Sequence, residues 1–348
     1  MKKLVYVLFS LLFPLISSEK SVHHHHESLQ SMQSAADLFI KSLEDKQLPK
    51  ALYEFQSKQR TVWNYLPDKY IKPDGKRYGL PITEMNAKQR IFAYGLLNSA
   101  LSQKGILKVN TVMVLEQLLF ELTKDKIRNP ELYYVSIYGT PSKTKTWGWR
   151  FEGHHLSINI TLVEGHHLSV TPIFLGGNPA KVLEGKYKGL TVLSEEDTLA
   201  RVLVKSLTPE QTKKVMLKAT PKDVISKFTP KVNRNFFDLK NGLTYSSLSV
   251  EQQKQLQSLV KVYILKFRPE LIKQLDNSPL SETNSMVFAW AGGTELGDGH
   301  YYRIVTKGHL IEFHNIKNKT GHAHCVWREF DGDFGEDLLL KHLHEKHK

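Results

Sequence analysis

The sequence contains little cysteine and few long apolar runs. Cys325 is the single thiol among 348 residues, so no intramolecular disulfide can form. Packing, a bound metal or both must therefore stabilise the fold. The apolar run at residues 4–16 is shorter than the roughly 20 residues that a membrane-spanning helix needs. We expect no transmembrane span in the mature chain, with a membrane anchor at this run as the alternative.

Short motifs of several enzyme classes are also missing. The sequence has no HExxH, no nucleophile elbow and no dinucleotide fingerprint. The triplet Asp333-Phe334-Gly335 is not evidence of a kinase, because neither a glycine-rich phosphate loop nor a VAIK-like strand accompanies it. The function therefore has to be inferred from clusters of residues.

The first 27 residues have the pattern of an exported protein. Lys2 and Lys3 precede the apolar run, and residues 16–18 (Ile-Ser-Ser) form a plausible cleavage site. We expect a signal peptide at residues 1–18 and an exported protein that is periplasmic, extracellular or on the cell surface. Residues 19–27 are expected to form a polar tail. Their run of four histidines (His23–His26) can bind metal loosely, but we do not expect it to be the functional metal site.

Basic side chains exceed acidic ones along the whole chain. The 48 Lys and Arg residues against 35 Asp and Glu residues give a net charge of +13. The excess is scattered instead of being clustered on one helix or loop. This favours contact with an anionic envelope or polysaccharide, and we expect no nucleic-acid partner.

Hydrophobic spacing predicts an α+β fold in a single domain over residues 28–348. Its expected parts are helices at 28–130, a long hairpin at 133–175 that turns near Glu164-Gly165, helices at 194–277, and a meander with a final helix at 286–345. N-cap signatures at Ser194, Thr208 and Ser249 open three of the helices. We expect the two groups of strands to lie in one sheet or to face each other.

The C-terminal meander is expected to place several histidines on one face. The two-residue turn Lys307-Gly308 predicts that Arg303 lies opposite Glu312, Tyr302 opposite Phe313 and His300 opposite Asn315. The next strand is predicted to place His322 near Asn315 and His324 near Phe313. His300, His322, His324 and Arg328 would then share a face, while Cys325 would be a buried thiol on the other.

These imidazoles are candidate metal ligands. His322 and His324 are two residues apart on a strand, so both can reach one ion. His300 lies two strands away, and His154 or His155 could complete the set from the hairpin. Three histidines and a water molecule form a catalytic type of zinc site, and copper or iron is also suitable. The alternative is a core of hydrogen-bonded histidines. The hexapeptide EGHHLS recurs from Glu164, at the predicted turn, where we interpret it as a coincidence.

Three charged residues are candidates for catalysis. Glu152 is the candidate general base, with an ion pair to Arg150 as the alternative. Arg328 could bind an anionic substrate group or transition-state charge, with a salt bridge to Asp331 or Asp333 as the alternative. Asp333 is expected to start a helix and to orient a histidine.

The sequence resembles a family known as domain of unknown function 3500. The resemblance is carried by WGWRFEGHHLS, GGNPA, GHYYRI and HAHCVWRE followed by DFGEDLL, and it covers nearly the whole mature chain. His314, Cys325 and Glu329 depart from the family pattern, in which we expect Asp, Ser and Asp. The resemblance implies export but no particular activity.

Two functions from different classes follow. The first is an exported metal-dependent hydrolase acting on a small-molecule or polymer substrate. The alternative is a non-catalytic binding protein of the cell envelope with an aromatic platform for carbohydrate or peptide, formed by Trp147, Trp149, Trp290 and Tyr302. A metal-free oxidoreductase is a third, more distant class. A binding module would display these rings, whereas an enzyme would bury them around a pocket.

Overall fold

The computed structural model of the chain describes residues 19–340 except 238, 276 and 318–320. The predicted signal peptide at residues 1–18 lies outside the described residues. Residues 19–27, which were expected to be a polar tail, already belong to the first helix.

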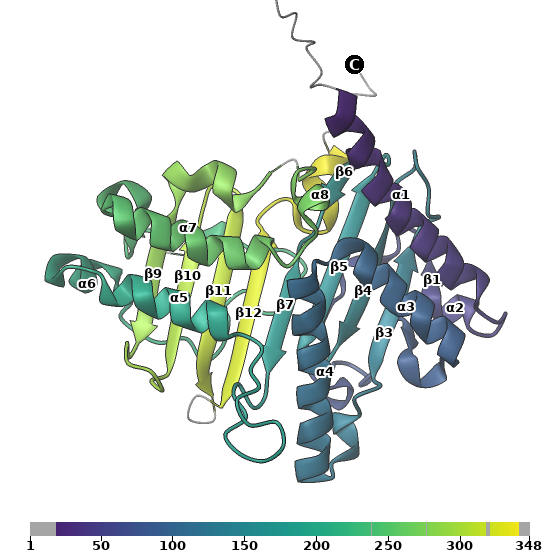
Figure 1. Cartoon of the computed structure of the whole chain (residues 1–348), viewed down its shortest axis with the longest axis horizontal. Coiled ribbons are helices and arrows are strands. Elements are labelled where there is room, and N and C mark those ends of the chain that lie inside the picture. The colour runs from purple at the N-terminus through teal and green to yellow at the C-terminus, as the bar shows by residue number, and fades with distance from the viewer. Residues whose placement is uncertain (1–18, 238, 276, 318–320, 341–348) are drawn as a thin grey trace, which may run out of the picture.

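Twelve strands of the described residues form one sheet (Figure 1). Their order is β1-β3-β4-β5-β7-β12-β11-β10-β9-β8, with β2 beside β3 and β6 beside β5. The strands are β1 (Leu52–Tyr53), β2 (Leu80–Pro81), β3 (Tyr133–Tyr138), β4 (Trp147–Gly153), β5 (Leu156–Val163), β6 (His167–Ser169), β7 (Ile173–Gly177), β8 (Leu243–Thr244), β9 (Val287–Gly292), β10 (His300–Val305), β11 (His309–Lys317) and β12 (His322–Glu329). The hairpin strands meet the meander where β7 pairs with β12 antiparallel. Both groups of strands therefore lie in one sheet, which is one of the two arrangements that we expected.

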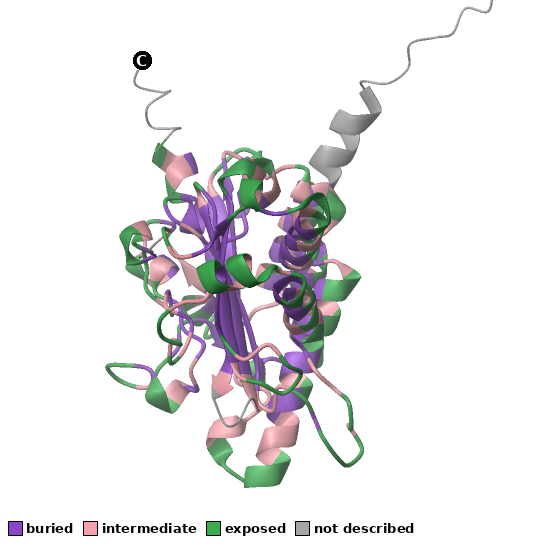
Figure 2. Cartoon of the chain, turned by 90° about the vertical axis from the view of Figure 1, so that its left-hand side faces the viewer, coloured by how far each residue is buried: buried purple, intermediate pink, exposed green. Residues whose placement is uncertain are grey.

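Helices cover one face of this sheet, and irregular segments cover the other (Figure 2). The helices are α1 (Glu19–Lys41), α2 (Leu48–Ala51), α3 (Ala87–Ala100), α4 (Gln103–Thr123), α5 (Ser194–Lys205), α6 (Pro209–Val215), α7 (Val250–Ile264) and α8 (Pro269–Ile272), and residues 336–340 are also helical. The α+β class is confirmed. Among the described helices, none combines the length and apolar character that crossing a bilayer requires.

The predicted helix starts are mostly confirmed. Thr208 and Ser249 each form a capping box, with Gln211 and Gln252 respectively. Ser194 is not an N-cap, because it is the first residue of α5 and no side chain caps that end.

The predicted register of the meander is right on one side of β11 and wrong on the other. Tyr302 lies opposite Phe313, as expected, but Phe313 lies opposite Cys325 instead of His324. An irregularity between His314 and Lys317 shifts β12 by one residue. A slip of one residue moves every side chain of a strand to the other face. His324 and Arg328 therefore face the irregular segments, whereas His300 and Phe313 face the helices.

The long hairpin turns earlier than expected. The chain reverses at His154-His155, between β4 and β5, and again near Glu164 before β6. Because Glu152 pairs with Ser157, it does not share the face of Leu156, and that part of the predicted pattern is wrong. Both copies of EGHH thus lie at turns. The first is buried, whereas His166 of the second is exposed.

Candidate metal centre

Three imidazoles meet at the end of the sheet where the β4–β5 turn lies beside β7 and β12. The Nε2 atoms of His155 and His322 lie 2.7 Å apart, and those of His322 and His324 lie 2.9 Å apart. His155 and His324 are buried, whereas His322 is half-buried. Among the described residues, these three have ligand atoms close enough together to hold one ion.

The two contacts of His322 cannot both be ordinary hydrogen bonds. A ring nitrogen carries either one proton or one in-plane lone pair, so it has one good hydrogen-bonding direction. Two other nitrogens within 3 Å of the same Nε2 atom compete for that direction. A cation between the three nitrogens could accept the lone pair of each Nε2 atom at the same time.

A carboxylate orients the third imidazole. His324 Nδ1 lies 2.6 Å from an oxygen of Asp223. An Nδ1–H group that donates to this carboxylate leaves the lone pair on Nε2, which faces the other imidazoles. Carboxylates hold metal-binding histidines in this way.

The floor of the cluster is a glycine in β7. A Cβ atom on Gly176 would lie 2.8 Å from a ring carbon of His155 and 2.9 Å from one of His324. Real Cβ atoms do not approach other atoms so closely, so both rings occupy space that any other residue would fill. Gly176 also donates its N–H to the carbonyl of His155, which has a left-handed φ of 61°. The glycine therefore fixes the turn and accommodates the rings.

Aromatic rings line one side of His324. Tyr65 and Phe174 stack on each other at 3.8 Å and present their edges or faces to His324 at 5.2 and 5.1 Å. The carbonyl of Tyr65 also accepts the N–H of His155. Tyr65 thus connects two of the three imidazoles.

Glu152 anchors the segment that carries Tyr65. Its carboxylate receives the Asn64 N–H at 2.9 Å and pairs with Arg77 at 2.6 Å. Arg150, the partner expected from the sequence, is farther away at 3.8 Å. Glu152 is buried among these partners. Its carboxylate therefore holds the Asn64–Tyr65 segment in position and is not accessible to a substrate.

Arg328 and Asp333 anchor the segment that carries Asp223. Arg328 pairs with Asp333 at 2.6 Å and donates to the carbonyls of Lys227 and Thr229. The salt bridge that was the alternative for Arg328 is therefore present. The prediction that Asp333 orients a histidine is wrong, because its carboxylate bonds to Arg328 and to the N–H of Glu329. Asp223 and Glu116 are the carboxylates that contact histidines here.

A second group lies directly behind His155. The ring of His154 stacks on that of His155 at 3.7 Å, and its Nδ1 atom lies 2.6 Å from Glu116 of α4. Burial raises the pKa of Glu116 to about 8, against the opposing charge of Arg128. Burial and then Arg128 lower the pKa of His154 well below its usual range. Near pH 7 the carboxyl group of Glu116 is therefore protonated and the imidazole of His154 is uncharged, so the pair has no net charge.

His155 is also neutral at physiological pH. Burial, followed by the charges of neighbouring histidines, lowers its pKa well below the usual range. A neutral imidazole has a lone pair to offer, which is the form that binds metal ions.

His300 lies elsewhere, on the helix side of the sheet. Its Nδ1 atom lies 2.9 Å from Arg201, and its ring stacks on Trp290 at 4.3 Å. Its neighbours Arg201, Asp197 and Asn315 line a separate cavity of about 470 Å³. The predicted grouping of His300 with His322 and His324 is wrong, because the register slip puts the sheet between them.

The expected aromatic platform is not displayed. Trp147, Trp149, Trp290 and Tyr302 are at most 1% exposed and belong to the core beneath the helices. A binding function based on these four rings therefore loses its supporting observation. Cys325 lies in the same core, on the face opposite His324, as predicted.

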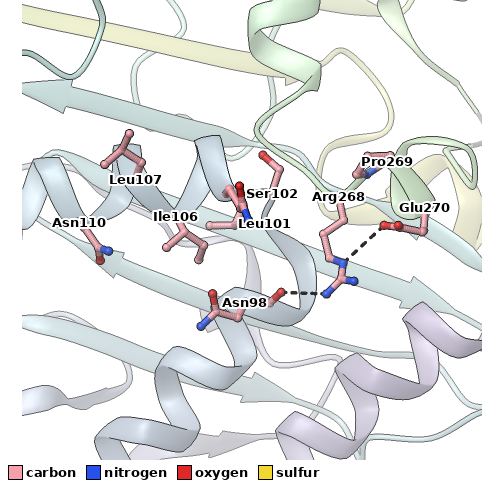
Figure 3. Close-up of a pocket in the computed structure, with 10 residues that line it drawn as sticks. Asn98, Leu101, Ser102, Ile106, Leu107, Asn110, Arg268, Pro269 and Glu270 are labelled. Carbon is pink, nitrogen blue, oxygen red and sulfur yellow. Dashed lines mark hydrogen bonds and ion pairs between the residues drawn. The ribbon is translucent and has the colours of Figure 1, made fainter.

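A surface hollow of about 600 Å³ lies along the first turns of α4 (Figure 3). Its lining includes Asn98, Leu107 and Arg268, and Arg268 contacts both the Asn98 carbonyl and Glu270. It brings together no group of histidines, so the imidazole cluster remains the stronger candidate.

Comparison with known proteins gives a family but no activity. No curated protein and no solved structure matches the chain. A family model does match, over residues 25–336, and this range includes every residue of the imidazole cluster. The chain therefore belongs to the family described as Protein of unknown function (DUF3500).

Proposed function

We propose that the protein is a metal-dependent hydrolase whose ion is held by His155, His322 and His324. The observation that carries the proposal is the convergence of three Nε2 atoms, two of them within 3 Å of the third. Zinc is the first choice, because three imidazoles and one open position form its common catalytic site; copper and iron accept the same ligands.

The geometry is compatible with such an ion. With Zn–N distances of about 2.0–2.1 Å, the nitrogens of a tetrahedral site lie roughly 3.3 Å apart. The two separations of 2.7 and 2.9 Å are shorter by a few tenths of an ångström, which small ring rotations would add. His322 is half-buried, whereas the other two ligands are buried, so the cluster is nearest to solvent on the His322 side.

The surrounding residues support hydrolysis. A divalent ion in such a site lowers the pKa of bound water to about 7 and so supplies a nucleophile at neutral pH. Asp223 keeps His324 oriented, and Gly176 leaves space for the rings of His155 and His324. The Glu116–His154 pair lies directly behind His155 and is uncharged near pH 7, so it adds no positive charge beside the ion.

Elemental analysis tests the metal. We expect about one equivalent of a transition metal in protein purified without chelators and lacking His23–His26. His322→Ala and His324→Ala should each lose it, because removing one of three ligands abolishes tight binding. Cys325→Ser is the matched control, since this residue directly follows His324 on β12 but faces the other side of the sheet.

Two outcomes would overturn the metal site: wild-type protein without metal, or a Cys325→Ser variant that loses metal as readily as the histidine variants. The cluster would then be a hydrogen-bonded core. The hydrolase part is tested with a panel of chromogenic carboxylic and phosphoric esters. Turnover should disappear on chelation and return with the metal, and turnover by the metal-free protein would contradict the proposal.

We also propose that residues 1–18 direct export, on the basis of the sequence pattern alone. Mass spectrometry of the protein from its native host should show a chain that begins after Ser18. A cell-interior protein with residues 1–18 retained would contradict it.

A further inference from the structure

Arg128 lies beside the imidazole cluster on a short 3-10 turn that follows α4. Its Nη1 atom is 3.2 Å from both ring nitrogens of His154, and the residue is half-buried. His154 stacks on His155, so one imidazole ring connects the guanidinium to the edge of the three-imidazole site.

Arg128 differs from the structural arginines of this molecule. Those residues are buried, and each has several partners among carboxylates, backbone carbonyls, the Asn159 amide and His300; they are Arg77, Arg150, Arg201 and Arg328. Within the described residues, His154 is the single side chain within hydrogen-bonding distance of Arg128, and Arg128 forms no ion pair there. A guanidinium has five N–H donors, so most of them are available to a ligand.

No described carboxylate forms an ion pair with this charge. Arg128 and a divalent ion at the adjacent imidazoles would repel each other in a partly desolvated site. Glu116, His154 and His155 also have ligand atoms close enough for a second ion, but the guanidinium already places positive charge there. The arrangement favours a negatively charged group beside Arg128, at the edge of the imidazole cluster.

We propose that Arg128 binds an oxyanion of the substrate, a carboxylate or a phosphate, and holds it next to His155, His322 and His324. This assignment of substrate class rests on the proposed function. The planar guanidinium matches both oxyanions with two parallel hydrogen bonds. The net charge of +13 agrees with anionic substrates, because it favours their approach.

Calorimetric titration of the metal-loaded full chain with inorganic phosphate and with acetate tests the proposal. We expect Arg128→Gln to weaken binding of the preferred anion by about tenfold or more. Arg128→Lys should retain part of the affinity, because it keeps the charge but loses the planar fork. Lys126→Gln is the matched control: it removes the same charge from the same turn, without a contact to His154, and should change affinity less than about twofold.

The metal content of each sample separates the two proposals. One equivalent of metal in all variants, with anion binding weakened only at Arg128, supports the inference, and the stronger of the two anions identifies the substrate class. Equal anion binding by Arg128→Gln, or no binding of either anion by wild type, overturns the inference while metal remains. Absence of metal from wild type overturns the proposed function and the substrate assignment with it.

Discussion

At the scale of single residues, the cluster consists of candidate ligands and of charged residues that support them. His155, His322 and His324 direct nitrogens at a common point. Asp223 contacts His324 from behind, while Glu152 and Arg328, which the sequence suggested as catalytic, fasten the segments on either side. Sites of this kind depend on such supporting contacts for their geometry.

Asp223→Asn should weaken metal binding by about 10–100-fold while the fold is retained. The amide keeps the size of the side chain but accepts the His324 proton less strongly. Competition with a chromogenic chelator gives the affinity. Asp331→Asn is the control, since Asp331 is largely exposed and pairs with an exposed lysine. Unchanged affinity in Asp223→Asn would show that this carboxylate does not support the ligand.

The sequence predicted part of this site and could not predict the rest. His322 and His324 are two residues apart on one strand, so their shared face follows from strand geometry alone. Asp223, Glu116 and Arg128 were missed because they lie on segments 26–101 residues away from the histidines they contact. No local pattern marks a single acidic or basic residue that long-range packing brings to a site.

At the scale of elements, one residue of register separates the prediction from the structure. The tight turn at Lys307-Gly308 made the β10–β11 pairing predictable. The polar connection after β11 contains an irregularity, and nothing in the sequence shows where an extra residue is absorbed. That residue decides which side of the sheet His324 and Arg328 face, and it separates His300 from them.

The two EGHH copies should respond differently to substitution, although both lie at turns. Replacing buried His154 and His155 by Ala should cost about 2–4 kcal/mol of unfolding free energy, because the stacked rings and the Glu116 contact are lost. Replacing His166 and His167 should cost less than about 0.5 kcal/mol, since His166 is exposed. Urea denaturation measures both. Equal tolerance would remove the first copy from the site.

At the scale of the whole molecule, a buried charge group ties the helix layer together. Glu196 of α5 pairs with Lys108 of α4 at 2.9 Å and with Lys266, just after α7, at 3.0 Å. Burial alone would raise the pKa of Glu196, but Lys266 and Lys108 outweigh it and hold that pKa below its usual value of 4.5. The carboxylate therefore stabilises the fold fully above pH 4.5, and this contribution is lost as the pH falls through the native pKa.

Glu196→Gln should cost about 3–5 kcal/mol at pH 7, because it leaves two buried ammonium groups without their partner. It should also remove part of the stability loss that wild type shows below pH 4.5. Denaturant unfolding between pH 3 and pH 7 measures both effects. Glu251→Gln, at an exposed pair, is the control. A variant with the wild-type acid profile would contradict the assignment.

The pairing of β7 with β12, called the seam below, has a consequence for how the chain folds. His155 and His322 are 167 residues apart, so the first ligand is synthesised long before its partners. An ion bound at the seam would close a loop of that length and restrict the unfolded chain, as a covalent bridge does elsewhere. A protein with one cysteine cannot form that bridge within itself. Coordination at the seam would serve in its place, and it would be completed only when the last strand is in position.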